Sequence, residues 1–226
     1  MATLDADVRS GELRPVYLLT GREAYLVRRA QAMVEEAALK GQPGASFNRQ
    51  VMVGSASTPD QVDEAVRTLP MMGSRRLVVV EGIDQGDKKK AKALQERCAE
   101  IAKVQVSTCV LVLTAEKIDG RSKLFKSVGK LGRAVEFKPL YGRKLEGWLD
   151  GEARRLEKRL QPRVASLLVD LVGNDLGKLH NELEKLAFYV GDEDTIDLRA
   201  AEDTRADVRL DDVFQLNEAL GNGDLN

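Results

Sequence analysis

The sequence predicts an α/β protein in which a mostly parallel, five-stranded sheet with helices on both faces precedes a small helical domain. Three observations predict this class. Short apolar runs alternate with longer segments of helical periodicity up to residue 140. Beyond that point only the helical period continues. The charge also changes sign there, since residues 1–140 carry 23 Lys and Arg against 17 Asp and Glu, whereas residues 141–226 carry 12 against 19.

Most of the predicted strands are short and rich in Val and Leu, as strands buried on both faces are. The predicted strands cover residues 16–20, 47–53, 77–80, 108–113 and 134–137. The helices expected between them cover residues 24–40, 58–69, 88–101 and 120–130. The second of these has a clear start, because Thr58 can serve as N-cap, Pro59 suits the first helical position and Gln61 completes a capping box.

Residues 138–142 are expected to be a linker, because they combine Pro139 and Gly142 between two periodic segments. Three amphipathic helices are predicted after it, over residues 143–158, 162–172 and 176–190. One more short element is expected near Thr195, and a last helix over residues 213–220.

Composition excludes several classes of protein. The two cysteines and one histidine have no zinc spacing and are too few for a secreted disulfide framework. No apolar run approaches the roughly 20 residues needed to cross a bilayer, and the N-terminus lacks the pattern of a signal peptide. The expectation is a reduced, cytoplasmic protein. The excess of basic residues in its first part allows weak phosphate contact. These residues are less densely clustered than in a dedicated nucleic-acid binder.

Gly21 follows a strand and precedes a helix, where a phosphate-binding loop would lie. Such a loop needs further glycines, a Lys and a Ser or Thr. The loop reads Thr20, Gly21, Arg22, Glu23. It has no Gly-Lys-Ser/Thr sequence, and Glu23 would repel phosphate. ATP hydrolysis is therefore not expected here.

No other group of residues resembles a catalytic, cofactor or metal site. His180 is expected on the solvated face of a helix, with no second ligand nearby, and Glu35 and Glu36 are expected to be solvated charges. No Ser or Cys has a His and an acid arranged to activate it as a nucleophile. The basic run 88–90 fits a solvated helix start at least as well as a phosphate contact.

The turn before the third strand is the unusual feature. Met71 and Met72 lie between Pro70 and Gly73, just after Leu69. Turns are usually polar, and Met is an adaptable residue both in cores and on recognition surfaces. The residues alone leave two readings open, in which the Met pair either packs under the turn or is displayed to a partner.

Four stretches, in order along the chain, resemble the delta subunit of the bacterial DNA polymerase III clamp loader. They are Pro15–Leu26, Leu69–Val78, Gly173–Leu186 and Val213–Asp224. Each is weak alone, but the ordered set is specific. The resemblance implies an AAA+-like sheet domain over residues 1–140, a helical lid domain over 141–208 and the start of a helical collar domain over 209–226.

The resemblance also implies a function. Delta subunits of this family bind the ring-shaped sliding clamp (the beta subunit) and open it, without hydrolysing ATP, for loading on primed DNA. A pair of large apolar residues in the turn before the third strand binds the clamp, and Met71 and Met72 occupy these positions, flanked by Leu69, Pro70 and Gly73. Many members have Leu and Phe there. Further partners implied are the gamma/tau and delta-prime subunits and, through the assembled complex, primer–template DNA.

Three alternatives remain from the sequence. A delta-prime subunit would carry a Ser-Arg-Cys motif, for which the nearest match is Ser107-Thr108-Cys109, without the arginine. A nucleotide-binding AAA+ ATPase would need the degenerate loop at Gly21 to be functional. A nucleic-acid-binding module would rely on the basic first part of the chain.

Overall fold

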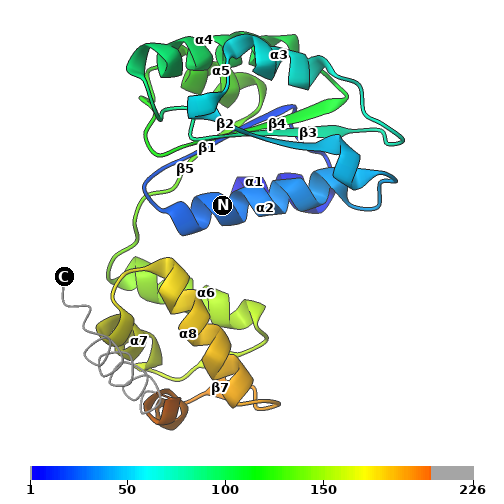
Figure 1. The fold of residues 1–226 in the computed structure, drawn as a ribbon. Helices are drawn as coiled ribbons and strands as arrows, with labels where there is room; N and C mark the ends of the chain where they lie inside the picture. The colour runs from blue at the N-terminus through cyan, green and yellow to red at the C-terminus, as the bar shows by residue number, and fades with distance from the viewer. Residues whose placement is uncertain (1, 205–226) are drawn as a thin grey trace, which may run out of the picture. The chain divides into compact units, whose positions relative to one another are not determined.

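Five parallel strands form the sheet of the first part of the chain, in the order β2-β3-β4-β1-β5 (Figure 1). The strands are β1 (Val16–Thr20), β2 (Arg49–Val53), β3 (Arg76–Glu81), β4 (Cys109–Ala115) and β5 (Arg133–Glu136). This computed structural model describes residues 2–204. The predicted fold class is confirmed. The expected collar segment 209–226 lies outside the described residues.

Helices cover both faces of the sheet. In Figure 1, α1 and α2 lie on one face and α3, α4 and α5 lie on the other. The five helices are α1 (Ala2–Ser10), α2 (Ala24–Leu39), α3 (Pro59–Arg67), α4 (Lys88–Val104) and α5 (Lys123–Leu131). The capping box expected at the start of α3 is present, with Thr58 accepting from the Gln61 amide and the Gln61 side chain accepting from the Thr58 amide.

The core lies on both sides of the central strands. Alternate residues of a strand point to opposite faces, so Leu18 and Val78 pack with α3, α4 and α5, while the buried Tyr17 and Val79 point to the opposite face. All residues of β1 and β4 are buried, as expected for a parallel sheet covered on both faces. Strand β2 differs, because it lies at the edge of the sheet and leaves Val51 and Val53 exposed.

Helix α1 was not expected from the sequence. Its Asp7 is buried and accepts two hydrogen bonds from the guanidinium of Arg133, at 3.0 Å from Nε and 2.7 Å from Nη2. The hydrogen bonds to Asp7 raise the pKa of Arg133 above its usual value. The hydroxyl of Tyr17 accepts from the amide of Arg14, in the segment after α1. These contacts join α1 and the following segment to β5 and β1.

The described residues divide into two units, the first ending at Pro139 and the second beginning at Leu140. In the second unit three helices pack against one another and a pair of two-residue parallel strands lies beside them. These elements are α6 (Arg143–Arg155), α7 (Val164–Val172), α8 (Leu176–Tyr189), β6 (Arg159–Leu160) and β7 (Thr195–Ile196). Residues 198–204 are also helical.

His180 does not lie on a solvated face. Its side chain is 22% exposed, with Nδ1 3.2 Å from Glu152 and Nε2 3.3 Å from Glu184. Glu152 is buried in α6. The histidine therefore links α8 to α6 inside the helical unit. The expectation that it lies on a solvated face is wrong.

We expect Asp7→Ala to lower the free energy of unfolding by about 2–3 kcal/mol, because it leaves the largely buried guanidinium of Arg133 without its carboxylate. Urea unfolding measures this loss. Asp5→Ala on the same helix is the matched control, with an expected change under about 0.5 kcal/mol. Equal stability of the two variants would show that α1 is not held by this ion pair.

Candidate partner-binding site

The turn between α3 and β3 presents its apolar side chains to solvent. Leu69 is 73% exposed, Met71 59% and Met72 76%. Pro70 and Gly73, which flank the Met pair, are partly buried. Large apolar side chains rarely gather on the surface without a partner. Of the two readings left open by the sequence, packing of the Met pair under the turn does not occur, since both side chains are exposed.

A buried asparagine holds this turn in place. Asn48 is fully buried at the end of a short 3-10 helix, η1 (Ala45–Asn48). Its side-chain oxygen accepts from the amide of Met71 at 2.6 Å, and its side-chain nitrogen donates to the carbonyl of Met71 at 2.7 Å. One amide side chain thus pairs with both the N–H and the C=O of Met71. In an irregular turn these backbone groups would otherwise hydrogen-bond to water.

A second amide side chain holds the following residues. Oε1 of Gln42 accepts from the amides of Ser74 and Arg75, at 3.1 and 3.0 Å. Gly73 passes between the two amide side chains. A β-carbon at Gly73 would lie 2.8 Å from Nδ2 of Asn48 and 2.8 Å from Oε1 of Gln42, so a larger residue would require both amide groups to shift.

Arg76 joins three elements at the base of the turn. Its guanidinium donates to the carbonyl of Ala65 in α3, to the carbonyl of Phe47 in η1 and to Oε1 of Gln50 in β2, at 3.2, 3.5 and 2.6 Å. Arg76 therefore belongs to the framework of the turn. With Asn48 and Gln42, it fixes the backbone that carries Met71 and Met72.

The residues of segment 42–48 were missed by sequence reasoning. Asn48 lies 23 positions before Met71, and a single polar residue before a strand gives no signal of its partner. Phe47 was assigned to the second strand, but it lies in η1 and its side chain is 66% exposed. Only the fold brings these residues to the turn.

Two amides of the loop after β1, those of Gly21 and Glu23, are engaged by the protein and cannot cradle a phosphate. The amide of Gly21 donates to the carbonyl of Ala115 at 3.1 Å, and that of Glu23 donates to the carbonyl of Phe137 at 3.3 Å. A β-carbon at Gly21 would lie 2.0 Å from the carbonyl oxygen of Phe137. The loop is packed tightly against the chain that follows β5, as a strand-to-helix turn.

An open cleft of about 430 Å³ lies beside this loop, at the carboxyl ends of β1, β3 and β4. Its charged lining is mixed, with Arg22 and Arg28 against Glu81 and Glu116. Gln31, also in the lining, donates to Glu81 at 2.9 Å. The carboxylates oppose the binding of a polyphosphate, and no lysine lies among the lining residues.

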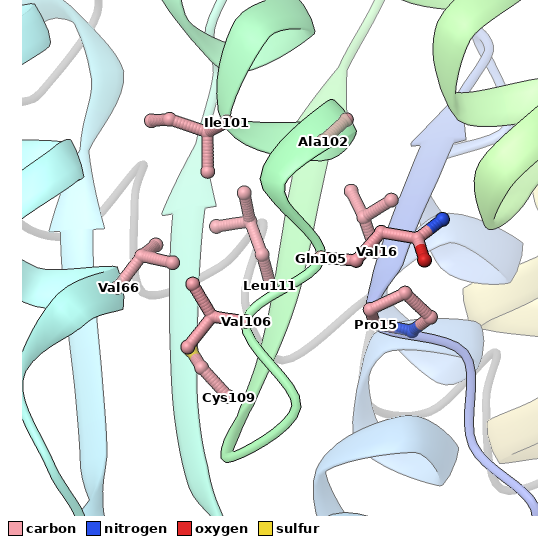
Figure 2. Close-up of a pocket in the computed structure, with 9 residues that line it drawn as sticks. All are labelled: Pro15, Val16, Val66, Ile101, Ala102, Gln105, Val106, Cys109 and Leu111. Atoms are coloured by element: carbon pink, nitrogen blue, oxygen red, sulfur yellow. The ribbon is translucent and has the colours of Figure 1, made fainter.

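The cysteines are core residues. Cys109 lines a small apolar cavity of about 10 Å³ between β4, β1 and the ends of α3 and α4 (Figure 2). Burial raises the pKa of Cys109 to about 11 and that of Cys98 to about 12. Neither thiol is ionised near neutral pH, so neither is an activated nucleophile.

Within residues 2–204 no cluster of His, Cys, Asp and Glu side chains could hold a metal ion. The helices described over the same range are all too short or too polar to span a bilayer. Among the features described, the exposed turn is therefore the one that best fits a functional site, and its chemistry is that of a protein contact.

Comparisons with known proteins point to one family. The family described as DNA polymerase III, delta subunit, matches residues 17–138, which is more than half of the chain. DNA polymerase III subunit delta of Bacillus subtilis is 30% identical over 215 residues, covering 92% of this chain and 58% of that protein. The solved Bacillus subtilis DNA clamp loader delta protein matches with a TM-score of 0.73 and 28% identity, covering 89% of this chain and 61% of the other. The chain thus spans about three fifths of these relatives.

We expect Asn48→Ala to speed hydrogen exchange at the Met71 amide at least about tenfold and to lower the free energy of unfolding by about 1–2 kcal/mol, because both hydrogen bonds to Met71 are lost. Exchange measured by NMR and urea unfolding give the two values. Ser46→Ala, an exposed change in the same short helix, serves as control. A Met71 amide that exchanges at the original rate in Asn48→Ala would contradict the role of Asn48.

Proposed function

Because the chain belongs to the family of DNA polymerase III delta subunits, we propose that it binds the sliding clamp and opens its ring for loading on primed DNA. In this proposal Met71 and Met72 enter an apolar pocket on the clamp, and Leu69, Pro70 and Gly73 shape the turn that carries them. The observation that carries the proposal is the exposure of both Met side chains on a turn fixed by Asn48 and Gln42.

The physical chemistry of the turn supports such a role. Burying two Met side chains contributes about 3–6 kcal/mol before the cost of ordering is subtracted. The hydrogen bonds to Asn48 and Gln42 hold the backbone in one conformation before binding, so less ordering is required on contact. A small apolar anchor on a rigid turn can therefore supply most of the binding energy of a larger interface.

Ring opening requires no chemistry in this chain. A subunit that binds the open clamp interface more tightly than the closed one shifts the ring toward the open form. We propose that the chain is non-catalytic, and the loop at Gly21 supports this, since the amides of Gly21 and Glu23 already donate to protein carbonyls. ATP would then act in other subunits of the loader. We propose the gamma/tau and delta-prime subunits as further partners.

We expect Met71→Ala with Met72→Ala to weaken binding to the cognate sliding clamp about 100-fold, because both apolar anchors are removed. A direct titration followed by fluorescence anisotropy or calorimetry measures the affinity. Both side chains are exposed, so the urea unfolding curve is expected to stay unchanged.

The matched control is Val104→Ala, which truncates another exposed apolar side chain of the same unit, at the end of α4. It is expected to leave clamp affinity unchanged. If the unmodified protein binds the clamp and the double Met variant binds it with the same affinity, the turn is excluded as the binding site.

We expect calorimetric titration with ATP and Mg²⁺ to give no saturable binding at micromolar concentration, because the amides of Gly21 and Glu23 are not available to phosphate. An ATP-binding subunit of the same loader provides the positive control. Micromolar binding would instead favour the alternative of a nucleotide-dependent ATPase.

A further inference from the structure

We propose that Phe47 is a third apolar contact residue of the same surface, so that the clamp receives an aromatic ring together with the two thioethers. This inference rests on the proposed function and adds a residue from a different segment of the chain. Phe47 lies in η1, before the edge strand β2, and 24 residues before Met71.

The side chains of Phe47 and Met72 are neighbours. A β-carbon built on Gly44 would lie 3.7 Å from the Phe47 ring and 3.5 Å from the β-carbon of Met72. The two side chains thus border the same small space beside Gly44. Phe47 is 66% exposed and Met72 76%, so the ring and the thioether are presented to solvent from adjoining positions.

The contacts that fix the Met turn also fix Phe47. The next residue, Asn48, holds both backbone groups of Met71, and the carbonyl of Phe47 accepts from Arg76 at the start of β3. The two segments therefore form one rigid support. An anchor surface held in this way loses little conformational freedom on binding.

Phe47 is also distinct among the exposed side chains. In the described part of the first unit, it is the one aromatic residue among the exposed large apolar side chains. Aromatic residues are enriched among the side chains that dominate protein interfaces. Lone exposed apolar residues are common, but this ring adjoins Met72 and extends the apolar surface formed by Leu69, Met71 and Met72.

The partner pocket must therefore have room for a ring beside two unbranched side chains. The anchors themselves carry no charge, so recognition at this point depends on shape and desolvation. A pocket that accepted the Met pair alone would leave the ring at its rim in water, where its removal would have no effect.

The test is Phe47→Ala, titrated with the cognate sliding clamp beside Met71→Ala with Met72→Ala. Phe188→Ala is the matched control, since this ring is 89% exposed in the second unit. We expect Phe47→Ala to weaken binding about tenfold, mainly through faster dissociation, and Phe188→Ala to change it less than about twofold. Unfolding in urea checks that each variant keeps its fold.

The outcomes separate the two proposals. Loss of affinity in both Phe47→Ala and the double Met variant supports the inference. Loss in the double Met variant alone overturns the role of Phe47 and leaves the clamp-binding turn standing. Wild-type affinity in both removes the proposed site itself, and the inference with it.

Discussion

Two hydrogen bonds between the side chain of Asn48 and the backbone of Met71 set the conformation on which the rest of the site depends. They connect the segment before β2 to the segment before β3, and the asparagine side chain that makes them is buried. Gln42 and Arg76 add contacts that hold the residues on either side. The sheet supplies the geometry, because β2 and β3 are neighbours and their amino ends lie together. Polar groups in the interior thus allow apolar groups to remain on the surface.

In the loop at Gly21, backbone amides form hydrogen bonds within the protein where a phosphate-binding loop would present them to a ligand. In a phosphate-binding loop the amides at this point of the sheet face the ligand, whereas here they donate to carbonyls of the protein. The hydrogen bonds from Gly21 and Glu23 close the end of β1 against β4 and the segment after β5. The carboxylates of the neighbouring cleft reinforce this change. The exposed Met turn lies at the amino edge of the strands, away from the carboxyl edge at which this loop lies.

Local signals in the sequence were enough to predict most of the fold. Strand β1 and the capping box at Thr58 depend on adjacent residues and were confirmed. Helix α1 was missed because its main anchor, the Asp7–Arg133 pair, joins positions 126 residues apart. The same limit applies to the site. The Met pair could be singled out from its composition, but its exposure and its support by Asn48 depend on long-range packing. The resemblance to a known family, not the periodicity, favoured display.

Met72 has a left-handed backbone conformation, with φ of 58°. A side chain with a β-carbon costs about 1 kcal/mol in this region, whereas Gly would adopt it without strain and Asn at lower cost. A chain under selection for stability alone would therefore favour Gly or Asn at this position. Under the proposed function, the large apolar residue at this position gives up some folding stability for the contact surface it provides. Thermostabilising substitutions at position 72 would then come at the expense of recognition.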